Sequence, residues 1–205
     1  MSRNISQALA AWLAAGETRM GELAIQGRYE LRHHLDCAAE GLAVHSAPEA
    51  AYEIALYDKA GNYRPLKTAP TLRRGWRLVL ETIEQLHEAL DFFYPAMLAA
   101  RLAFEQGRLG VTPLRETLNR QSGMYAITKK ISDSHADRLI GAFCRSDGGC
   151  LKTIMWAIAP GVPVTSLPAE KFKPGANGAS IPLLCAEPCN LFVAAAREAV
   201  KKEGP

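Results

Sequence analysis

Four of the five cysteines fall into two closely spaced pairs, and they constrain the fold more than any other feature of the sequence. Cys144 and Cys150 have five residues between them, and Cys185 and Cys189 have three. Such spacing lets two thiolates face one point, but the pairs themselves lie far apart along the chain. We therefore expect a C-terminal fold that brings the second pair back to the first.

The setting of these thiols favours a metal centre. No apolar stretch is long enough to span a bilayer and no cleavable signal follows Met1, so we expect a cytoplasmic protein with no membrane contact. A reducing compartment keeps thiols free of structural disulfides. Clustered cysteines in such a protein are typical of metal binding.

The surroundings of the pairs favour an iron–sulfur cluster over zinc. Structural zinc sites usually place fewer residues between paired cysteines than the five that follow Cys144. The apolar run 181–184 before one pair, and Phe143 and Leu151 beside the other, suit a cluster that must be shielded from water. We expect a 4Fe-4S cluster, with 2Fe-2S, zinc or unliganded core thiols as the alternatives. The expected ligands are Cys144, Cys150, Cys185 and Cys189.

Residues next to the pairs add to this interpretation. Pro188 fits the first turn of a helix predicted over 190–202, which places Cys189 at a helix N-terminus, where partial positive charge favours a thiolate. Arg145 and Lys152 carry positive charge that would offset an anionic cluster, and solvated surface is the alternative for both.

The fifth cysteine, Cys37, stands beside His33, His34 and Asp36, which suggests a nucleophile with its base. Adjacent histidines on a strand point to opposite faces, so they cannot both address one thiol. We interpret Cys37 as a small buried thiol and name no catalytic residue.

Hydrophobic spacing predicts an α+β chain in two parts. With 205 residues, 48% of them hydrophobic, the chain can bury a core in each part. We expect a small mixed N-terminal domain over 1–92, packed on a mixed α/β iron–sulfur cluster domain over 93–205. The predicted helices cover 5–15, 48–57, 75–95, 96–106, 113–120, 134–143 and 190–202, the predicted strands cover 21–26, 29–34, 123–131 and 151–158, and a long Pro- and Gly-rich loop covers 159–182.

The charge of the chain selects no partner. The formal net charge of +3 comes from 24 basic and 21 acidic residues spread along the sequence. A nucleic-acid binder usually concentrates its basic residues, so we expect no nucleic-acid partner. The sequence leaves the oligomeric state open.

Several runs resemble the C-terminal extension of large sirohydrochlorin cobaltochelatase-like proteins, over about Gly21 to about Lys202. They are Tyr63-Arg64-Pro65-Leu66, Ala69-Pro70, Leu72-Arg73-Arg74-Gly75-Trp76, Tyr94-Pro95-Ala96 and the two cysteine pairs. The resemblance implies a stabilising domain followed by a domain that binds a 4Fe-4S cluster through the four paired cysteines. The chelatase-like domain of those proteins is absent from these residues, so the resemblance implies no chelatase activity for the chain itself.

These observations lead to an iron–sulfur protein with an electron-transfer, redox-sensing or structural role. By analogy, its expected protein partner is a chelatase-like or redox enzyme of a tetrapyrrole or cobalamin pathway. Two alternatives remain: an enzyme that acts on a tetrapyrrole near the cluster, and a zinc-stabilised interaction module.

Overall fold

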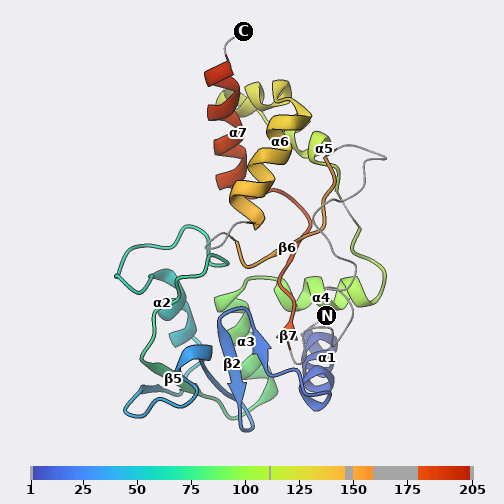
Figure 1. Ribbon diagram of the computed structural model, residues 1–205. Helices are drawn as coiled ribbons and strands as arrows, with labels where there is room; N and C mark the ends of the chain where they lie inside the picture. Colours follow the sequence, from blue (N-terminus) through green and yellow to red (C-terminus); the bar gives the residue numbers. More distant parts are fainter. Residues whose placement is uncertain (1, 111, 146–149, 159–179, 204–205) are drawn as a thin grey trace.

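The computed structural model describes residues 2–110, 112–145, 150–158 and 180–203. It confirms an α+β fold with two bodies, each with its own hydrophobic core (Figure 1). The lower body in Figure 1 holds a six-stranded sheet and four helices, and the upper body is helical.

The lower sheet is built mainly from the first 80 residues. The hairpin predicted around Gly27 is confirmed, because β2 and β3 pair antiparallel there and Gly27 takes a left-handed φ of 52°. The strands run in the order β4-β5-β3-β2-β1-β7. Their bounds are β1 Arg19–Met20, β2 Leu23–Gln26, β3 Glu30–His33, β4 Ala43–His45, β5 Trp76–Val79 and β7 Ser180–Ile181.

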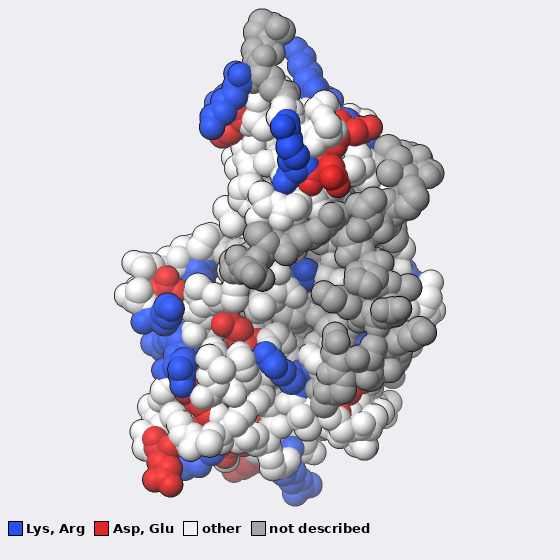
Figure 2. Space-filling model, in the orientation of Figure 1, with Lys and Arg blue, Asp and Glu red and all other residues white. Residues whose placement is uncertain are grey.

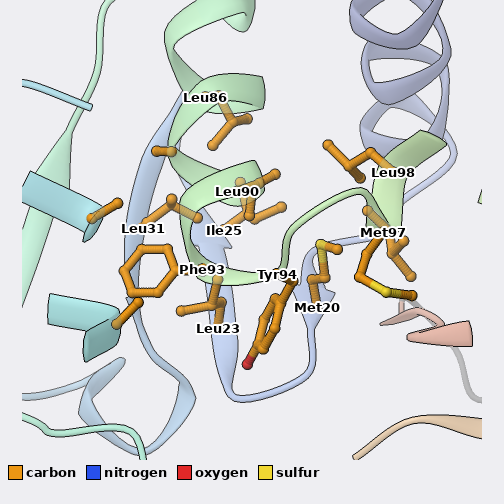
Figure 3. Close-up of a cluster of buried hydrophobic side chains, with 14 of the residues drawn as sticks. Met20, Leu23, Ile25, Leu31, Leu86, Leu90, Phe93, Tyr94, Met97 and Leu98 are labelled. Atoms are coloured by element: carbon orange, nitrogen blue, oxygen red, sulfur yellow. The ribbon is translucent and has the colours of Figure 1, made fainter. Parts of the chain in front are cut away.

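Four helices pack with this sheet around the lower core, and η1 (His34–Asp36) follows β3. Figure 3 shows α3 side chains such as Leu90 and Phe93 facing Leu23, Ile25 and Leu31 of the sheet. The ring of Phe93 also stacks on Trp76 of β5, with ring centroids 5.2 Å apart. The helices are α1 Ser2–Ala14, α2 Ala50–Leu56, α3 Ile83–Phe93 and α4 Met97–Glu105.

The helix predicted over 75–95 is wrong at its start. Residues Trp76–Val79 form β5, which pairs with β3 on one side and β4 on the other. A helix begins only after Thr82, whose hydroxyl accepts a hydrogen bond from the Gln85 N–H at 3.2 Å. The spacing of the apolar residues before Thr82 fits both the helical and the strand period. Pairing with the two neighbouring strands favours the extended form.

The upper body packs its helices around Phe192 and Trp156, whose rings meet edge to face at 5.4 Å. The strand predicted over 123–131 is wrong: it is the 3₁₀ helix η2, in which the Thr128 hydroxyl donates to the Tyr125 carbonyl. The elements are α5 Leu114–Asn119, η2 Gly123–Lys130, α6 Asp133–Ile140, the π-helical turn η3 Gly141–Arg145 and α7 Asn190–Glu203.

Two short parallel strands, β6 (Thr153–Ile154) and β8 (Leu184–Cys185), lie between the cores. Because side chains alternate along a strand, Ile154 belongs to the upper core while the next residue, Met155, belongs to the lower one. Leu184 and Cys185 divide in the same way. The strand predicted over 151–158 is therefore much shorter than expected, and it joins the two cores.

The segment before β8 also reaches into the lower body. There β7 lies parallel to β1, with Met20 opposite Ile181. The loop predicted over 159–182 lies outside the described residues as far as 179, and residues 180–181 form β7.

On the face shown in Figure 2, acidic and basic side chains are interspersed. No helix in the described ranges combines the length and the apolar character that crossing a bilayer requires.

Candidate metal centre

All four paired cysteines line one cavity of about 160 Å³. Leu66 contributes to its wall from the lower body, while Ile154 and Trp156 contribute from the upper core. Phe143 and Leu191 also line it, and each is 42% exposed. The fold thus brings two distant cysteine pairs to a mostly apolar site near the surface.

Each cysteine comes from a different local structure. Cys144 lies on η3, the π-helical turn that continues α6, and π turns in helices are frequent at functional sites. Cys150 is held by a hydrogen bond from its N–H to the Phe143 carbonyl, at 3.3 Å. Cys185 lies on β8, and Cys189 directly precedes α7, where its carbonyl accepts the Val193 N–H.

The electrostatics of Cys185 show how closely the thiols share this space. Burial raises the pKa of the Cys185 thiol, and the neighbouring Cys150 and Cys189 raise it further, because a second negative charge beside a thiolate is unfavourable. Lys152, which also lines the cavity, acts in the opposite direction. Several thiolates here would need a cation to balance them.

The sulfur of Cys150 has two polar neighbours. The hydroxyl oxygen of Thr68 lies 3.4 Å from Cys150 Sγ, and the backbone N–H of Lys152 donates to the same sulfur at 3.4 Å. Thr68 belongs to the lower body and is only 4% exposed. The lower body therefore takes a direct part in the site.

The site fits an iron–sulfur cluster by two observations. Four thiols on one cavity are the donor set that such clusters take. The indole N–H of Trp156, also on the cavity wall, is buried without a hydrogen-bond partner among the described residues. An acceptor inside the cavity, such as cluster sulfur, would satisfy it.

Within the described ranges, no three His, Cys, Asp or Glu side chains come together closely enough to hold a single metal ion. The four paired cysteines are related instead by the one cavity that they all line.

The other residues singled out in the sequence take different places. Lys152 lies at the cavity, and the side chain of Arg145 lies outside the described residues. A further residue of the cavity wall, Trp156, is 2% exposed and packs in the upper core. Thr68 and Leu66 were missed because they lie in the N-terminal part of the chain, far from the cysteine pairs in sequence, and no metal-ligand spacing marks them.

Near Cys37, the expectation that His33 and His34 point to opposite faces of a strand is wrong. The rings of His33 and His34 stack, with centroids 4.9 Å apart, because β3 ends at His33 and a 3₁₀ turn begins at His34. His33 faces Glu22, and Asp36 accepts hydrogen bonds from Arg74 and from the Gly75 N–H. These groups are used in structural contacts, and Cys37 is a half-buried thiol away from the cavity.

Two family models divide the chain. Residues 5–104 match the DR2241 stabilising domain, and residues 106–198 match a 4Fe-4S iron–sulfur cluster binding domain that includes all four paired cysteines. The boundary that we predicted between residues 92 and 93 stays a prediction.

The chain is also similar to a solved structure, that of DR2241 from Deinococcus radiodurans. The two share 31% sequence identity with a TM-score of 0.79, over 98% of this chain and 42% of that one. DR2241 is described as a multi-domain protein with structural similarity to chelatases and with two additional novel domains. The present chain therefore spans less than half of that protein. No curated protein matches it.

Proposed function

The chain belongs to the proteins that join a DR2241 stabilising domain to a 4Fe-4S cluster binding domain, and from this premise we propose that it carries a 4Fe-4S cluster for electron transfer. The proposed ligands are Cys144, Cys150, Cys185 and Cys189. One observation carries the proposal: the four thiols, from two distant stretches of sequence, line a single cavity.

A bound 4Fe-4S cluster would supply a centre that accepts and releases one electron at a time. The residues of this chain hold and shield that centre. Leu66, Ile154 and Trp156 provide apolar walls, and Lys152 places a positive charge near thiolates that are negatively charged. Such walls limit the access of water and thereby influence the reduction potential.

The place of the cavity supports exchange of electrons with another molecule. Phe143 and Leu191 line the cavity and are also 42% exposed, so part of the cavity wall is formed by residues that reach the surface. A redox-sensing role would use the same feature. A purely structural role is the second candidate, favoured by the contact between Thr68 of the lower body and Cys150 of the upper body.

The first experiment is purification under anaerobic conditions. The protein is expected to be brown and to contain about four irons and four acid-labile sulfides per chain, as a 4Fe-4S cluster requires. Single Cys→Ser substitutions at the four cavity cysteines are expected to remove most of the colour. A colourless protein that contains zinc would refute the proposal.

The chain offers a matched control in its fifth cysteine. Cys37 is also partly buried but does not line the cavity. Cys37→Ser is therefore expected to keep the full iron and sulfide content. If C37S lost the cluster as fully as Cys185→Ser, general loss of folding would explain the effect, and the ligand assignment would lose its support.

A second experiment separates electron transfer from a structural role. Reversible reduction by dithionite, followed by electron paramagnetic resonance, is expected if the cluster transfers electrons. A cluster that resists reduction, or that breaks down in one cycle, would favour the structural role.

We also propose that this module works with a chelatase-like protein part. The proposal rests on DR2241, which is described as similar to chelatases and of which the chain spans 42%. A tetrapyrrole such as sirohydrochlorin, titrated while the cluster spectrum is observed, would test direct substrate contact. An unchanged spectrum would indicate that the tetrapyrrole binds to the chelatase-like part and does not contact the cluster.

A further inference from the structure

We propose that Thr68, a residue of the lower body, raises the reduction potential of the cluster through a hydrogen bond from its hydroxyl group to the sulfur of Cys150. This inference rests on the proposed function, since it concerns the same cluster. It adds a positioned residue that lies outside the four thiol ligands and outside the domain that contains them.

The contact between Thr68 and the cysteine segment is double. Its hydroxyl oxygen lies 3.4 Å from Cys150 Sγ, and its carbonyl oxygen accepts the Leu151 N–H at 2.8 Å. The side chain and the backbone of one residue thus bind two consecutive residues of the other body. With Thr68 only 4% exposed, water does not compete freely for the sulfur.

Side chains of the lower body hold the loop that carries Thr68 in place. Arg64 donates to the carbonyl oxygens of Lys67 at 2.8 Å and Ala69 at 2.6 Å, one on each side of Thr68. The Lys67 ammonium group donates to the Phe92 carbonyl at the end of α3. These bonds fix the backbone around Thr68, so its hydroxyl does not have to be ordered when the cluster binds.

Arg64 is in turn fixed by a buried carboxylate. One guanidinium nitrogen lies 3.7 Å from Glu22 Oε2, and another donates to the Ala55 carbonyl. Arg64 is 5% exposed and Glu22 is 8% exposed. The lower sheet thereby positions the loop, and the loop positions the hydroxyl at the cavity.

The chemistry gives the direction of the effect. A cysteine that ligates iron is a thiolate with no hydrogen, so in the shared contact the Thr68 hydroxyl must donate. When dithionite supplies one electron to the cluster, negative charge on the ligating sulfurs rises, and a donor to sulfur stabilises the reduced state more than the oxidised one. The hydroxyl therefore raises the potential.

The test is the reduction potential of the anaerobically purified, cluster-loaded protein with Thr68→Val, which has nearly the same shape but no hydroxyl. We expect the equilibrium constant for one-electron reduction to fall about tenfold, which corresponds to about 59 mV. Thr68→Ser keeps the hydroxyl and is expected to retain a potential close to that of the parent protein.

Thr128→Val is the matched control. Thr128 is fully buried, its hydroxyl donates to the Tyr125 carbonyl in η2, and it is not among the residues that line the cavity. T128V is expected to leave the potential unchanged. A shift in T128V as large as that in T68V would show a general effect of packing and overturn the inference.

The outcomes separate this inference from the proposed function. If the parent protein holds no iron and sulfide, the proposed function fails. If T68V holds the full cluster at an unchanged potential, only the role of Thr68 fails. If T68V holds no cluster, the T68S variant decides the question. A T68S protein with a full cluster and the parent potential would support the role of the hydroxyl, and a T68S protein without a cluster would overturn the inference.

Discussion

At the scale of single residues, Gly21 is a position where both the backbone conformation and the neighbouring side chains disfavour a Cβ atom. Its φ is +57°, and a Cβ there would lie 2.6 Å from the Tyr94 hydroxyl oxygen and 2.9 Å from Leu183 Cδ1. Tyr94 cannot retreat easily, because it is 1% exposed and its oxygen accepts the Glu22 N–H.

Gly21→Ala is therefore expected to destabilise the protein more than Gly27→Ala. Gly27 also has a positive φ, but a Cβ there would meet nothing within 4 Å. G27A should cost about 1–2 kcal/mol for the left-handed backbone, and G21A about 1–3 kcal/mol more for overpacking. Urea unfolding of the cluster-free proteins checks this, and equal losses in the two variants would contradict it.

Glu22 is a buried carboxylate of the lower body that contacts His33, Arg64 and the backbone of Leu72. Burial would raise its pKa, but hydrogen bonds from His33 and the Leu72 N–H, with the charge of Arg64, outweigh burial and lower it. Because His33 Nδ1 accepts the Leu35 N–H, Nε2 is the ring nitrogen that presents a hydrogen to Glu22.

Glu22→Gln is expected to lower the free energy of unfolding at pH 7 by about 1.5–3 kcal/mol, the usual value for a hydrogen bond to a charged group. Because the carboxyl pKa of Glu22 is lower in the folded state, the ionised carboxylate stabilises the fold fully at pH values above the ordinary carboxyl pKa of 4.5. This contribution disappears as the pH falls through the pKa of the folded state. The difference between E22Q and the parent should therefore shrink at pH 3–4.

Denaturant titrations of the cluster-free protein at several pH values measure this difference. Glu198→Gln is the control, since Glu198 is an exposed carboxylate that pairs with Lys201 on α7 and should change stability little. A difference between E22Q and the parent that is the same at pH 7 and pH 3 would contradict the assigned role of the charge.

Some of these single residues were predictable from the sequence and others were not. The spacing of the four paired cysteines is a local feature, and it correctly indicated that they would lie at one site, while their role as ligands stays a prediction. Thr68 was not predicted, because its meeting with Cys150 depends on packing between parts of the chain more than 80 positions apart. The stacking of His33 on His34 was also missed, since it requires knowing where β3 ends.

At the scale of elements, the errors have a common cause. Residues 76–79 and 123–130 have apolar spacing compatible with two kinds of structure, and in both places local features alone favoured the wrong one. The long helix α7 was placed well, and the part of the predicted helix that follows Thr82 was confirmed as α3, because apolar stripes are repeated over several turns in both. Short elements take their form from neighbours that the sequence does not display.

The segment from β7 to β8 provides the element-scale prediction. Leu183 is 3% exposed and packs in the lower core, although it belongs to the C-terminal half of the sequence. Leu183→Ala is expected to cost about 2–5 kcal/mol, as for other buried leucines. It should also increase amide hydrogen exchange in β1 and β2 of the lower sheet.

Leu35→Ala is the control, since Leu35 is 60% exposed and should change stability by less than about 0.5 kcal/mol. Exchange in β1 and β2 that stays at the parent level in L183A would show that the lower body is independent of this segment.

At the scale of the whole molecule, the two-body arrangement was predictable and the way the bodies are joined was not. Composition and resemblance indicated an N-terminal part and a cluster-binding part. No pattern in the sequence indicated that β7 would complete the lower sheet, or that Ile154 and Met155 would pack in different cores. Pairing between β1 and β7 is set by closure of the whole chain, which no local pattern encodes.

The position of β7 beside β1 has a consequence for the order in which a ribosome delivers the chain. Strand β1 is synthesised long before residues 180–181, so that side of the nascent sheet has unpaired backbone groups until β7 follows. Leu66 and Thr68 are likewise synthesised long before the cysteines with which they share the cavity or a contact. A cluster that is held by all four cysteines can therefore be enclosed only after translation has passed Cys189.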